Sequence, residues 1–340
     1  MRAVIPVAGV GTRLRPHTYA LPKVLLDVAG KPILAHILDA LVQRDIRDAT
    51  IITGYMGELI EEFVTKRYSN LKVDFVEQKE RLGLGHAIWT GKDTYKPDES
   101  LLIVLGDTVF DVDLSIVLNS KFSSIGIKYV DDPRRFGVVV LDENEDSKNN
   151  KITNGIKTIT KFVEKPETFV SNLAIVGMYY IANSPMLVEA LNNLINQNIR
   201  TREEYQLTDA LQLMLDKGEI FTTFPVEGWY DCGKPETLLS TNRFLLESYP
   251  IQKNLSTNTV VITPSYISEK ATVENSIIGP YTSIADGAVV KDSIIKNSII
   301  SYESKVINTL LIESIIGNEA EVIGKFIKYN VGNSSTIELD

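Results

Sequence analysis

The residues of this chain that are best suited to chemistry follow its first apolar stretch, residues 3–7. Gly9 and Gly11 can leave backbone N–H groups open to a ligand, and Arg13 and Lys23 add two positive charges nearby. Open N–H groups beside cations are typical of a site that binds phosphate. The stretch therefore suits either a dinucleotide or a nucleoside triphosphate.

Two common phosphate-binding patterns do not match this stretch. The dinucleotide pattern G-x-G-x-x-G needs a third glycine for close packing of helix and strand, and Leu14 stands at that position. The pattern G-x-x-x-x-G-K-[ST] is absent. Because Arg13 and Lys23 suit a polyphosphate better than a pyrophosphate diester, we favour a nucleoside triphosphate. The alternative is a glycine turn with surface cations.

Two aspartates offer a second kind of chemistry. Asp107 ends the apolar run at residues 101–106, where burial of an unpaired carboxylate would be costly. A cation would offset that cost, and Mg²⁺ prefers oxygen ligands, usually one or two carboxylates plus substrate phosphates. Asp231, in the stretch WYDCG, is the natural second ligand. Each aspartate also fits the alternative of a turn or cap residue.

The elements that must position these residues alternate between strands and helices over residues 1–245. Apolar runs rich in β-branched residues predict strands at 2–7, 49–54, 72–78 and 100–107, and helical spacing predicts a helix within 31–44. This order predicts an α/β fold with a doubly wound, mainly parallel, Rossmann-like sheet. Ligands bind such sheets outside the carboxyl ends of the strands, where Gly9–Arg13 and Asp107 should lie. The polar stretch Asp142–Gly155 predicts a solvated hairpin tip.

The pattern changes over residues 256–340, which we predict to be a second domain. The stretch ENSII at 274–278 returns as KDSII at 291–295, KNSII at 296–300 and ESII at 313–316. Such hexapeptide repeats predict a left-handed parallel β-helix, in which each coil buries its aliphatic residues against the next. We expect the repeats to form the interface of a homo-oligomer or a cap. A histidine-dependent acyltransferase is disfavoured because the histidines, His17, His36 and His86, all lie in the first half.

Composition narrows the classes of partner. A net charge of −9 argues against a nucleic-acid-binding protein, which normally carries a basic face. The single cysteine, Cys232, excludes an intramolecular disulfide and a cysteine-rich zinc site. The chain starts without a signal-peptide pattern and has no apolar run long enough for a membrane span, so we expect a cytoplasmic protein.

Several stretches together resemble the sugar-1-phosphate nucleotidylyltransferases, and they occur in that family's order along nearly the whole chain. The matching stretches are AGVGTRLRPHTYALPK, EQKERLGLGHAI, LGDTVF, FGVV, FVEKP, EYQLTDAL and WYDCGKPETLL. The C-terminal hexapeptide repeats resemble those of the family's longer members. The resemblance implies that a sugar-1-phosphate oxygen attacks the α-phosphorus of a nucleoside triphosphate and that pyrophosphate leaves.

The resemblance also implies roles for individual residues. Arg13 is expected to stabilise the departing pyrophosphate, and Lys23 is expected near the α-phosphate. The residues expected to bind nucleotide are Ala8, Gly9, Gly11, Thr12, Arg13, Gln78 and Gly83. Gly137, Glu164 and Lys165 are expected to bind the sugar phosphate, and Asp107 and Asp231 to hold Mg²⁺. His86 is expected to be structural or a neighbour of the base.

The substrates stay open at this point. Thr108 stands where relatives that use dTTP frequently have asparagine, and Phe136 stands where they often have tyrosine. The stretch GLGHA looks like uridylyltransferases, whereas the short spacing from GTRL to PK looks like the thymidylyl and adenylyl branches. We favour UTP or dTTP with glucose-1-phosphate. The alternatives are mannose-1-phosphate guanylyltransferase, glucose-1-phosphate adenylyltransferase, and a non-catalytic regulatory paralogue, which would be expected to have lost Arg13, Lys23 or Asp107.

Overall fold

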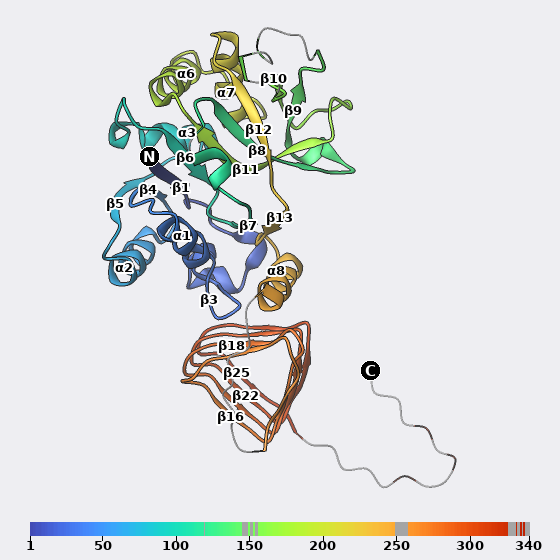
Figure 1. Cartoon of the computed structure of the whole chain (residues 1–340). Helices are drawn as coiled ribbons and strands as arrows, with labels where there is room; N and C mark the ends of the chain where they lie inside the picture. Colours follow the sequence, from blue (N-terminus) through green and yellow to red (C-terminus); the bar gives the residue numbers. More distant parts are fainter. Residues whose placement is uncertain are drawn as a thin grey trace. The chain divides into compact units, whose positions relative to one another are not determined.

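The structure is a computed structural model that describes residues 1–118, 120–144, 149, 152–153, 156–248, 258–325, 331, 334 and 336. Most of the predicted hairpin tip at 142–155 lies outside the described residues. The chain forms two compact units (Figure 1). One comprises Met1–Leu26 and Lys31–Leu238, and the other comprises Asp27–Gly30 and the chain from Leu239 onward. The predicted domain limits, 1–245 and 256–340, stay a prediction.

The first unit is built on a nine-stranded sheet. Its main path runs β10-β9-β11-β6-β1-β4-β5, and β8 pairs with β11 and β12. The strands are β1 (Arg2–Pro6), β4 (Asp48–Thr53), β5 (Lys72–Glu77), β6 (Leu101–Val104), β8 (Ser123–Tyr129), β9 (Gly137–Leu141), β10 (Ile159–Glu164), β11 (Leu173–Ile181) and β12 (Phe221–Pro225). Strands β5, β4, β1 and β6 are parallel, as predicted. Strand β11 runs antiparallel to β6, β8 and β9, which the alternating sequence pattern did not reveal.

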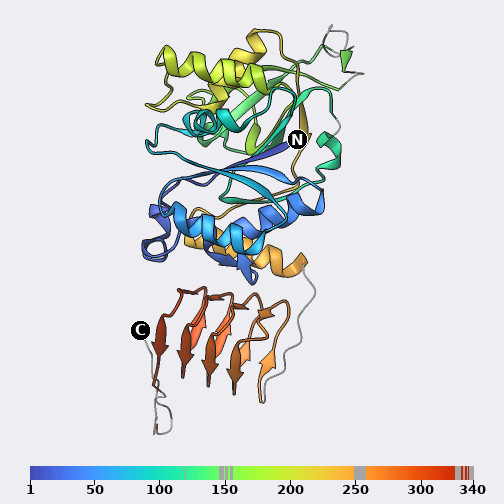
Figure 2. The same cartoon turned by 90° about the vertical axis from the view of Figure 1, so that its left-hand side faces the viewer.

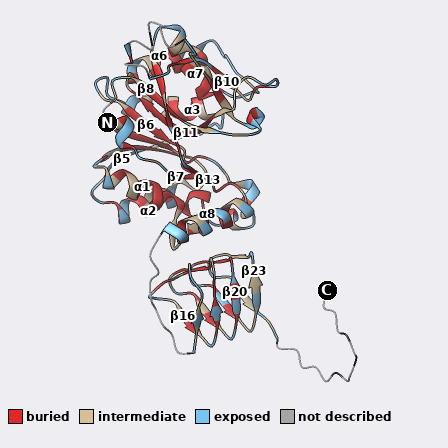
Figure 3. Cartoon of the chain, turned by 45° about the vertical axis from the view of Figure 1, so that its right-hand side comes forward, coloured by how far each residue is buried: buried red, intermediate tan, exposed pale blue. Residues whose placement is uncertain are grey.

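Helices cover both faces of this sheet. They are α1 (Ile33–Gln43), α2 (Gly57–Arg67), α3 (Leu84–Thr90), α4 (Ser115–Leu118), α6 (Ser184–Asn196) and α7 (Leu207–Asp216), whereas most of α8 (Pro235–Ser248) belongs to the second unit. Successive side chains of β1 point to opposite faces of the sheet and enter two different cores. Ala3 and Ile5 pack with α1 and α2. Val4 packs with α3, α6 and α7. The strands are buried between these layers (Figure 3). The predicted doubly wound fold is confirmed.

The order of the strands creates a crevice beside β1. The chain passes from β1 through α1 to β4 and through α2 to β5, and then returns through α3 to β6 on the other side of β1. Because the winding direction reverses there, the loops after β1 and β6 diverge and leave room for a ligand. The loop after β1 carries the glycines of the opening stretch, and Asp107 follows β6 closely.

The C-terminal repeats form three sheets of stacked parallel strands (Figure 2). The first sheet contains β14 (Val260–Val261), β17 (Ile277–Ile278), β20 (Ile294–Lys296) and β23 (Leu310–Ile312). The second contains β15 (Tyr266–Ile267), β18 (Ser283–Ile284), β21 (Ile299–Ile300) and β24 (Ile315–Ile316), and the third β16 (Thr272–Glu274), β19 (Val289–Lys291), β22 (Lys305–Ile307) and β25 (Glu321–Ile323). Buried aliphatic residues of successive coils stack inside, such as Ile278 on Ile295. The predicted left-handed parallel β-helix is confirmed.

No helix in the described part of the chain is both long enough and apolar enough to span a bilayer.

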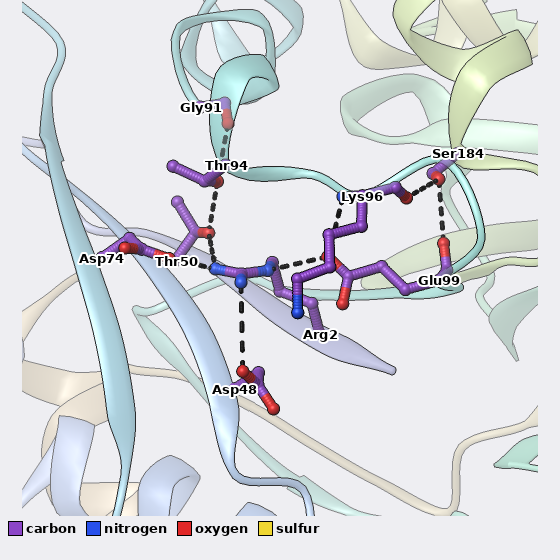
Figure 4. Close-up of polar contacts among 9 residues, drawn as sticks. All are labelled: Arg2, Asp48, Thr50, Asp74, Gly91, Thr94, Lys96, Glu99 and Ser184. Carbon is purple, nitrogen blue, oxygen red and sulfur yellow. Dashed lines mark hydrogen bonds and ion pairs between the residues drawn. The ribbon is translucent and has the colours of Figure 1, made fainter.

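A buried arginine ties the amino ends of the central strands together (Figure 4). Arg2 donates from Nε to Glu99 Oε1 at 2.9 Å and from Nη1 to Thr50 Oγ1 at 3.1 Å. Its guanidinium also forms ion pairs with Asp74 and, at 4.0 Å, with Asp48. These partners come from β4, β5 and the loop before β6, so one side chain joins the segments that flank β1 at the end opposite the crevice.

Replacement of Arg2 by methionine should lower the free energy of unfolding by about 2–3 kcal/mol. The variant keeps most of the apolar stem but leaves Glu99, which is nearly buried, without its cation. Asp48 and Asp74 are more exposed, so water compensates for part of the loss. Chemical denaturation of the full chain measures this effect. Lys66→Ala, which breaks an exposed ion pair with Glu62, is the control and should cost under about 0.5 kcal/mol.

Candidate functional site

A pocket of about 460 Å³ opens in the first unit beside the carboxyl ends of β1 and β6. Its wall contains nine residues that the sequence singled out: Ala8, Gly9, Gly11, Thr12, Arg13, Lys23, Gln78, Gly83 and Asp107. Other lining residues were not predicted, among them Arg81, Leu84, Glu204 and Gly233. The structure thus brings the predicted nucleotide-binding residues and one predicted metal ligand into a single cavity.

The glycine-rich loop bends so that it closes on the segment that carries Lys23. Gly11 has a φ of 68°, in the left-handed region that favours glycine, and it begins the short 3₁₀ turn η1 (Thr12–Leu14). A Cβ at Gly11 would lie 3.0 Å from the Cβ of Lys23 and 3.1 Å from the Cγ2 of Thr18. Thr18 also donates from Oγ1 to the Gly11 carbonyl at 2.9 Å. Gly11 therefore lets the loop and Lys23 approach the same side of the pocket.

Lys23 and Asp107 form an ion pair inside the pocket. The lysine Nζ lies 2.7 Å from Asp107 Oδ2, although the two residues are far apart in sequence. Lys23 is buried at 8% exposure, whereas the side chain of Asp107 is 42% exposed. A buried ammonium needs such a partner, because burial of an unpaired charge is costly. The pair therefore holds a fixed positive charge at the base of the pocket and leaves the carboxylate accessible.

A two-stranded ribbon brings Asp231 beside Asp107. Strand β13 (Gly228–Asp231) pairs antiparallel with β7 (Thr108–Asp111), with Asp231 opposite Thr108. The Cys232 N–H donates to the Asp107 carbonyl at 3.0 Å, which extends the pairing by one step. Asp107, directly before β7 and on the pocket wall, and Asp231, at the end of β13, offer the hard oxygen donors that Mg²⁺ takes. Within the described residues, no group of three or more His, Cys, Asp or Glu side chains could form an all-protein cage.

The side chains of Arg13 and Asp231 both lie close to Gly233. A Cβ at Gly233 would lie 2.9 Å from Arg13 Nη2 and 2.8 Å from Asp231 Oδ1. Any larger residue at this position would displace both side chains. The missing side chain of Gly233 therefore lets a guanidinium and a carboxylate converge at the edge of the pocket, a requirement that the sequence did not reveal.

The other side of the pocket is lined by Gln78 and Gly83. Gly83 has a φ of 105°, and a Cβ there would lie 2.7 Å from the Tyr205 carbonyl oxygen and 2.8 Å from the Cβ of Glu204. Backbone hydrogen bonds join this strip to Tyr205, which accepts from Gly85 N and donates to Leu82 O, both at 2.8 Å. Gly83 was expected to bind nucleotide, and that role stays a prediction. The structure shows that this glycine permits close approach of the chain around Tyr205.

Gly137, Glu164 and Lys165 lie together but are not among the residues that line the pocket. Gly137 pairs with Glu164 in β9–β10, and the Lys165 Nζ lies 3.1 Å from Glu164 Oε1. Thr208, on the first turn of α7, donates to Glu164 Oε2 at 2.7 Å. Lys165 has a φ of 41°, a backbone conformation that costs a lysine about 1 kcal/mol and is often found at functional sites.

Phe136 has a structural partner that the sequence did not predict. Its ring packs edge-on against Trp229, with 4.9 Å between the ring centroids. Phe136 precedes Gly137, and Trp229 lies two residues before Asp231 on β13. The aromatic contact therefore ties the predicted sugar-binding segment to the predicted metal-binding ribbon.

Comparison with known proteins agrees with this arrangement. The family model described as nucleotidyl transferase matches residues 2–248. The chain is 32% identical to the "Bifunctional protein GlmU" of Methanococcus vannielii, in an alignment covering 94% of this chain and 78% of that protein. It is 30% identical to the glucose-1-phosphate thymidylyltransferase of Streptomyces antibioticus, covering 95% of this chain and 93% of that protein.

A solved structure supports the fold. The chain superposes on a UDP-glucose pyrophosphorylase complexed with UDP-glucose with a TM-score of 0.60 at 24% identity, covering 73% of this chain and 99% of the other. The family model spans most of the chain, and these relatives align over nearly all of it. The chain belongs to the nucleotidyl transferase family of sugar-1-phosphate nucleotidyltransferases.

Proposed function

We propose that this protein joins a nucleoside triphosphate to a hexose-1-phosphate and releases a nucleoside diphosphate sugar and pyrophosphate. UTP or dTTP with glucose-1-phosphate is the favoured pair. The observation that carries the proposal is the convergence of Arg13, Lys23 and Asp107 on one pocket beside a glycine-rich loop. Two fixed cations and open N–H groups suit a triphosphate, and an accessible carboxylate suits the metal ion that accompanies it.

In this reaction, these residues would mainly position the reacting groups and neutralise charge. A phosphate oxygen of the sugar-1-phosphate attacks the α-phosphorus, and the bond from that phosphorus to the bridging oxygen breaks. Pyrophosphate leaves with the bonding electron pair. The attacking phosphate is already ionised at neutral pH, so no general base is required. Lys23 would hold the α-phosphate in line, and the guanidinium of Arg13 would neutralise charge that moves onto the departing pyrophosphate.

Asp107 and Asp231 would hold Mg²⁺ in this scheme. The metal ion, when bound, supplies positive charge next to the reacting phosphates. Lys23 already neutralises one oxygen of Asp107. The carboxylate would therefore be shared between the lysine and the metal ion, and Asp231 would supply the second protein oxygen.

A pyrophosphate-release screen tests the proposal. Purified full-length protein with Mg²⁺ is offered UTP, dTTP, GTP, ATP and CTP, each with glucose-1-phosphate and with mannose-1-phosphate. The expected result is release with UTP or dTTP and glucose-1-phosphate. Release only with GTP and mannose-1-phosphate, or only with ATP, would indicate the guanylyl or adenylyl alternative. No release from any combination would favour the non-catalytic regulatory paralogue.

We also propose that the β-helix makes the protein a homo-oligomer. Val260, Ile277, Ile294 and Leu310 occupy equivalent positions in successive coils and pair in register. All four are exposed, from 36% at Ile277 to 77% at Leu310. A continuous row of exposed aliphatic side chains across four coils is typical of a protein interface. A second copy presents the same row, so the surface is suited to self-association.

Replacement of Leu310 by aspartate should dissociate the oligomer, because it places a charge at the most exposed position of the apolar row. Light scattering coupled to size-exclusion chromatography measures the mass, and circular dichroism checks the fold. Ile323→Asp is the matched control, since Ile323 is 63% exposed on a different sheet of the same β-helix. A monomeric wild type, or a Leu310→Asp variant with the wild-type mass, would contradict the proposal.

A further inference from the structure

The side-chain amide of Gln78 is held in one orientation by two partners. Gln78 is buried at 6% exposure and lines the pocket. Its Nε2 lies 3.2 Å from the carbonyl oxygen of Gly83 and 3.1 Å from Nδ1 of His86. A carbonyl oxygen can only accept, so the atom that faces Gly83 must be the amide nitrogen. The two N–H groups of this amide are therefore committed to Gly83 and His86, and Oε1 is the group that remains for a ligand in the pocket.

The hydrogen bond between Gln78 and His86 fixes the protonation state of His86. Since Nε2 of Gln78 is a donor, Nδ1 of His86 must be the acceptor, and His86 is the neutral tautomer with its proton on Nε2. The ring is 9% exposed and stacks against Trp89 and Tyr205, with centroid separations of 5.7 Å and 6.3 Å. These contacts hold the imidazole in the plane that the hydrogen bond requires.

We propose that His86 is a positioning residue that makes Gln78 an acceptor-only reader of the base. With Oε1 opposite the ring nitrogen of the pairing edge, the site prefers bases whose ring nitrogen carries a proton. Uracil and thymine present N3–H, and guanine presents N1–H, whereas cytosine N3 and adenine N1 carry lone pairs that Oε1 would repel. The inference rests on the proposed function and deepens it, because it disfavours the adenylyl alternative, in which only the exocyclic amino group could donate to Oε1. His86 does not line the pocket among the described residues and acts only through Gln78.

The surroundings of His86 favour the neutral ring. Burial lowers the pKa of His86 below its ordinary value and Arg200 lowers it further, whereas Glu80 opposes the shift through its charge and a backbone hydrogen bond. Tyr205 faces the ring, and Lys92 lies over the ring of Trp89. With a lowered pKa, Nδ1 accepts throughout the neutral range and gains a proton only at acidic pH. Preference for UTP over CTP should therefore be constant near neutrality and fall only at acidic pH.

Nitrogen NMR on the nucleotide-free full-length protein tests the histidine directly. Spectra of ¹⁵N-histidine-labelled protein distinguish a protonated from an unprotonated ring nitrogen, and the His86→Leu variant assigns the signals. The expected result at neutral pH is an unprotonated Nδ1 in His86. A protonated Nδ1 would overturn the inference, and this readout needs neither nucleotide nor turnover.

Equilibrium binding of UTP and CTP tests whether His86 contributes to the choice of base. The two nucleotides differ only at the pairing edge, and titration of their phosphates cancels in the ratio of dissociation constants. His86→Leu removes the acceptor and should reduce the preference for UTP about tenfold, the loss expected for one hydrogen bond at the base edge. His86→Asn places Oδ1 near the position of Nδ1, so it should retain the preference and abolish its decline at acidic pH. Thr90→Ala is the control on the same helix and should match the wild type, because Thr90 donates to the Ala87 carbonyl and does not line the pocket within the described residues.

The outcomes separate the inference from the proposed function. If the wild type prefers UTP and releases pyrophosphate but His86→Leu keeps the full preference, the role of His86 is overturned and the function stands. If the wild type binds no nucleotide, both are overturned. If His86→Asn loses the preference as completely as His86→Leu, the ring itself and not its acceptor is required, and the inference is also overturned.

Discussion

Turnover should fall about a hundredfold or more when Asp107 is replaced by asparagine. The amide keeps the shape of the carboxylate but removes the charge that would attract Mg²⁺. It also removes the counter-charge of Lys23, whose Nζ lies 2.7 Å from Oδ2. Steady-state kinetics over a range of Mg²⁺ concentrations measures the effect. Loss of a ligand should raise the concentration of Mg²⁺ required as well as lower the maximal rate.

The folded state should tolerate the same change. Asp107 is 42% exposed, so water can replace part of the lost interaction with Lys23. Asp111→Asn is the matched control, because Asp111 lies on β7, the strand that directly follows Asp107, but does not line the pocket within the described residues. It should retain wild-type kinetics. A wild-type rate for Asp107→Asn at every Mg²⁺ concentration would remove Asp107 from the reacting centre.

Local features of the site could be predicted from the sequence because they depend on neighbouring residues. A strand followed by glycines has to turn at its carboxyl end, and the positive φ of Gly11 is the kind of conformation that glycine supplies. Asp107 was placed near this loop by one general rule, that parallel strands present their carboxyl ends on one edge. The β-helix was predictable for a similar reason, since each coil repeats the contacts of the one before it.

Contacts between distant segments could not be predicted in this way. Nothing local to Lys23 indicates that Asp107 neutralises it, and the pairing of Asp231 with Thr108 depends on a ribbon whose strands are far apart in sequence. The hydrogen bond from Thr208 to Glu164 likewise joins α7 to β10. The stretch EYQLTDAL contained Thr208, but its spacing alone does not place the hydroxyl beside that carboxylate. Packing of complete elements decides such contacts, and the tertiary fold is required to find them.

His86 illustrates how a residue's role can change when its partner is known. The sequence suggested a structural residue or a neighbour of the base, because the reaction needs no general base. The structure adds a hydrogen bond to Gln78, and the direction of that bond follows from the carbonyl of Gly83. A helix position behind the pocket thereby gains a part in recognition of the base, through an interaction that sequence spacing does not specify.

Replacement of Arg13 by lysine should also lower turnover about a hundredfold, with a smaller effect on KM. A guanidinium presents several donors in one plane and can bridge two phosphate oxygens as charge moves onto pyrophosphate, whereas lysine keeps the charge but loses the fork. Arg15→Lys is the matched control two residues away, since Arg15 lies over the ring of Tyr19 and is not among the residues that line the pocket. It should retain wild-type kinetics.

Ionic strength separates a catalytic Arg13 from a surface cation. A donor aimed at charge that develops in the transition state is worth about 3 kcal/mol, whereas an exposed ion contributes under about 1 kcal/mol and is screened by salt. The ratio of wild-type to Arg13→Lys turnover should therefore be large and nearly the same at low and moderate salt. A ratio under about threefold, or one that vanishes with added salt, would place the guanidinium outside the reacting phosphates. Its convergence with Asp231 at Gly233 would then be a feature of the pocket rim alone.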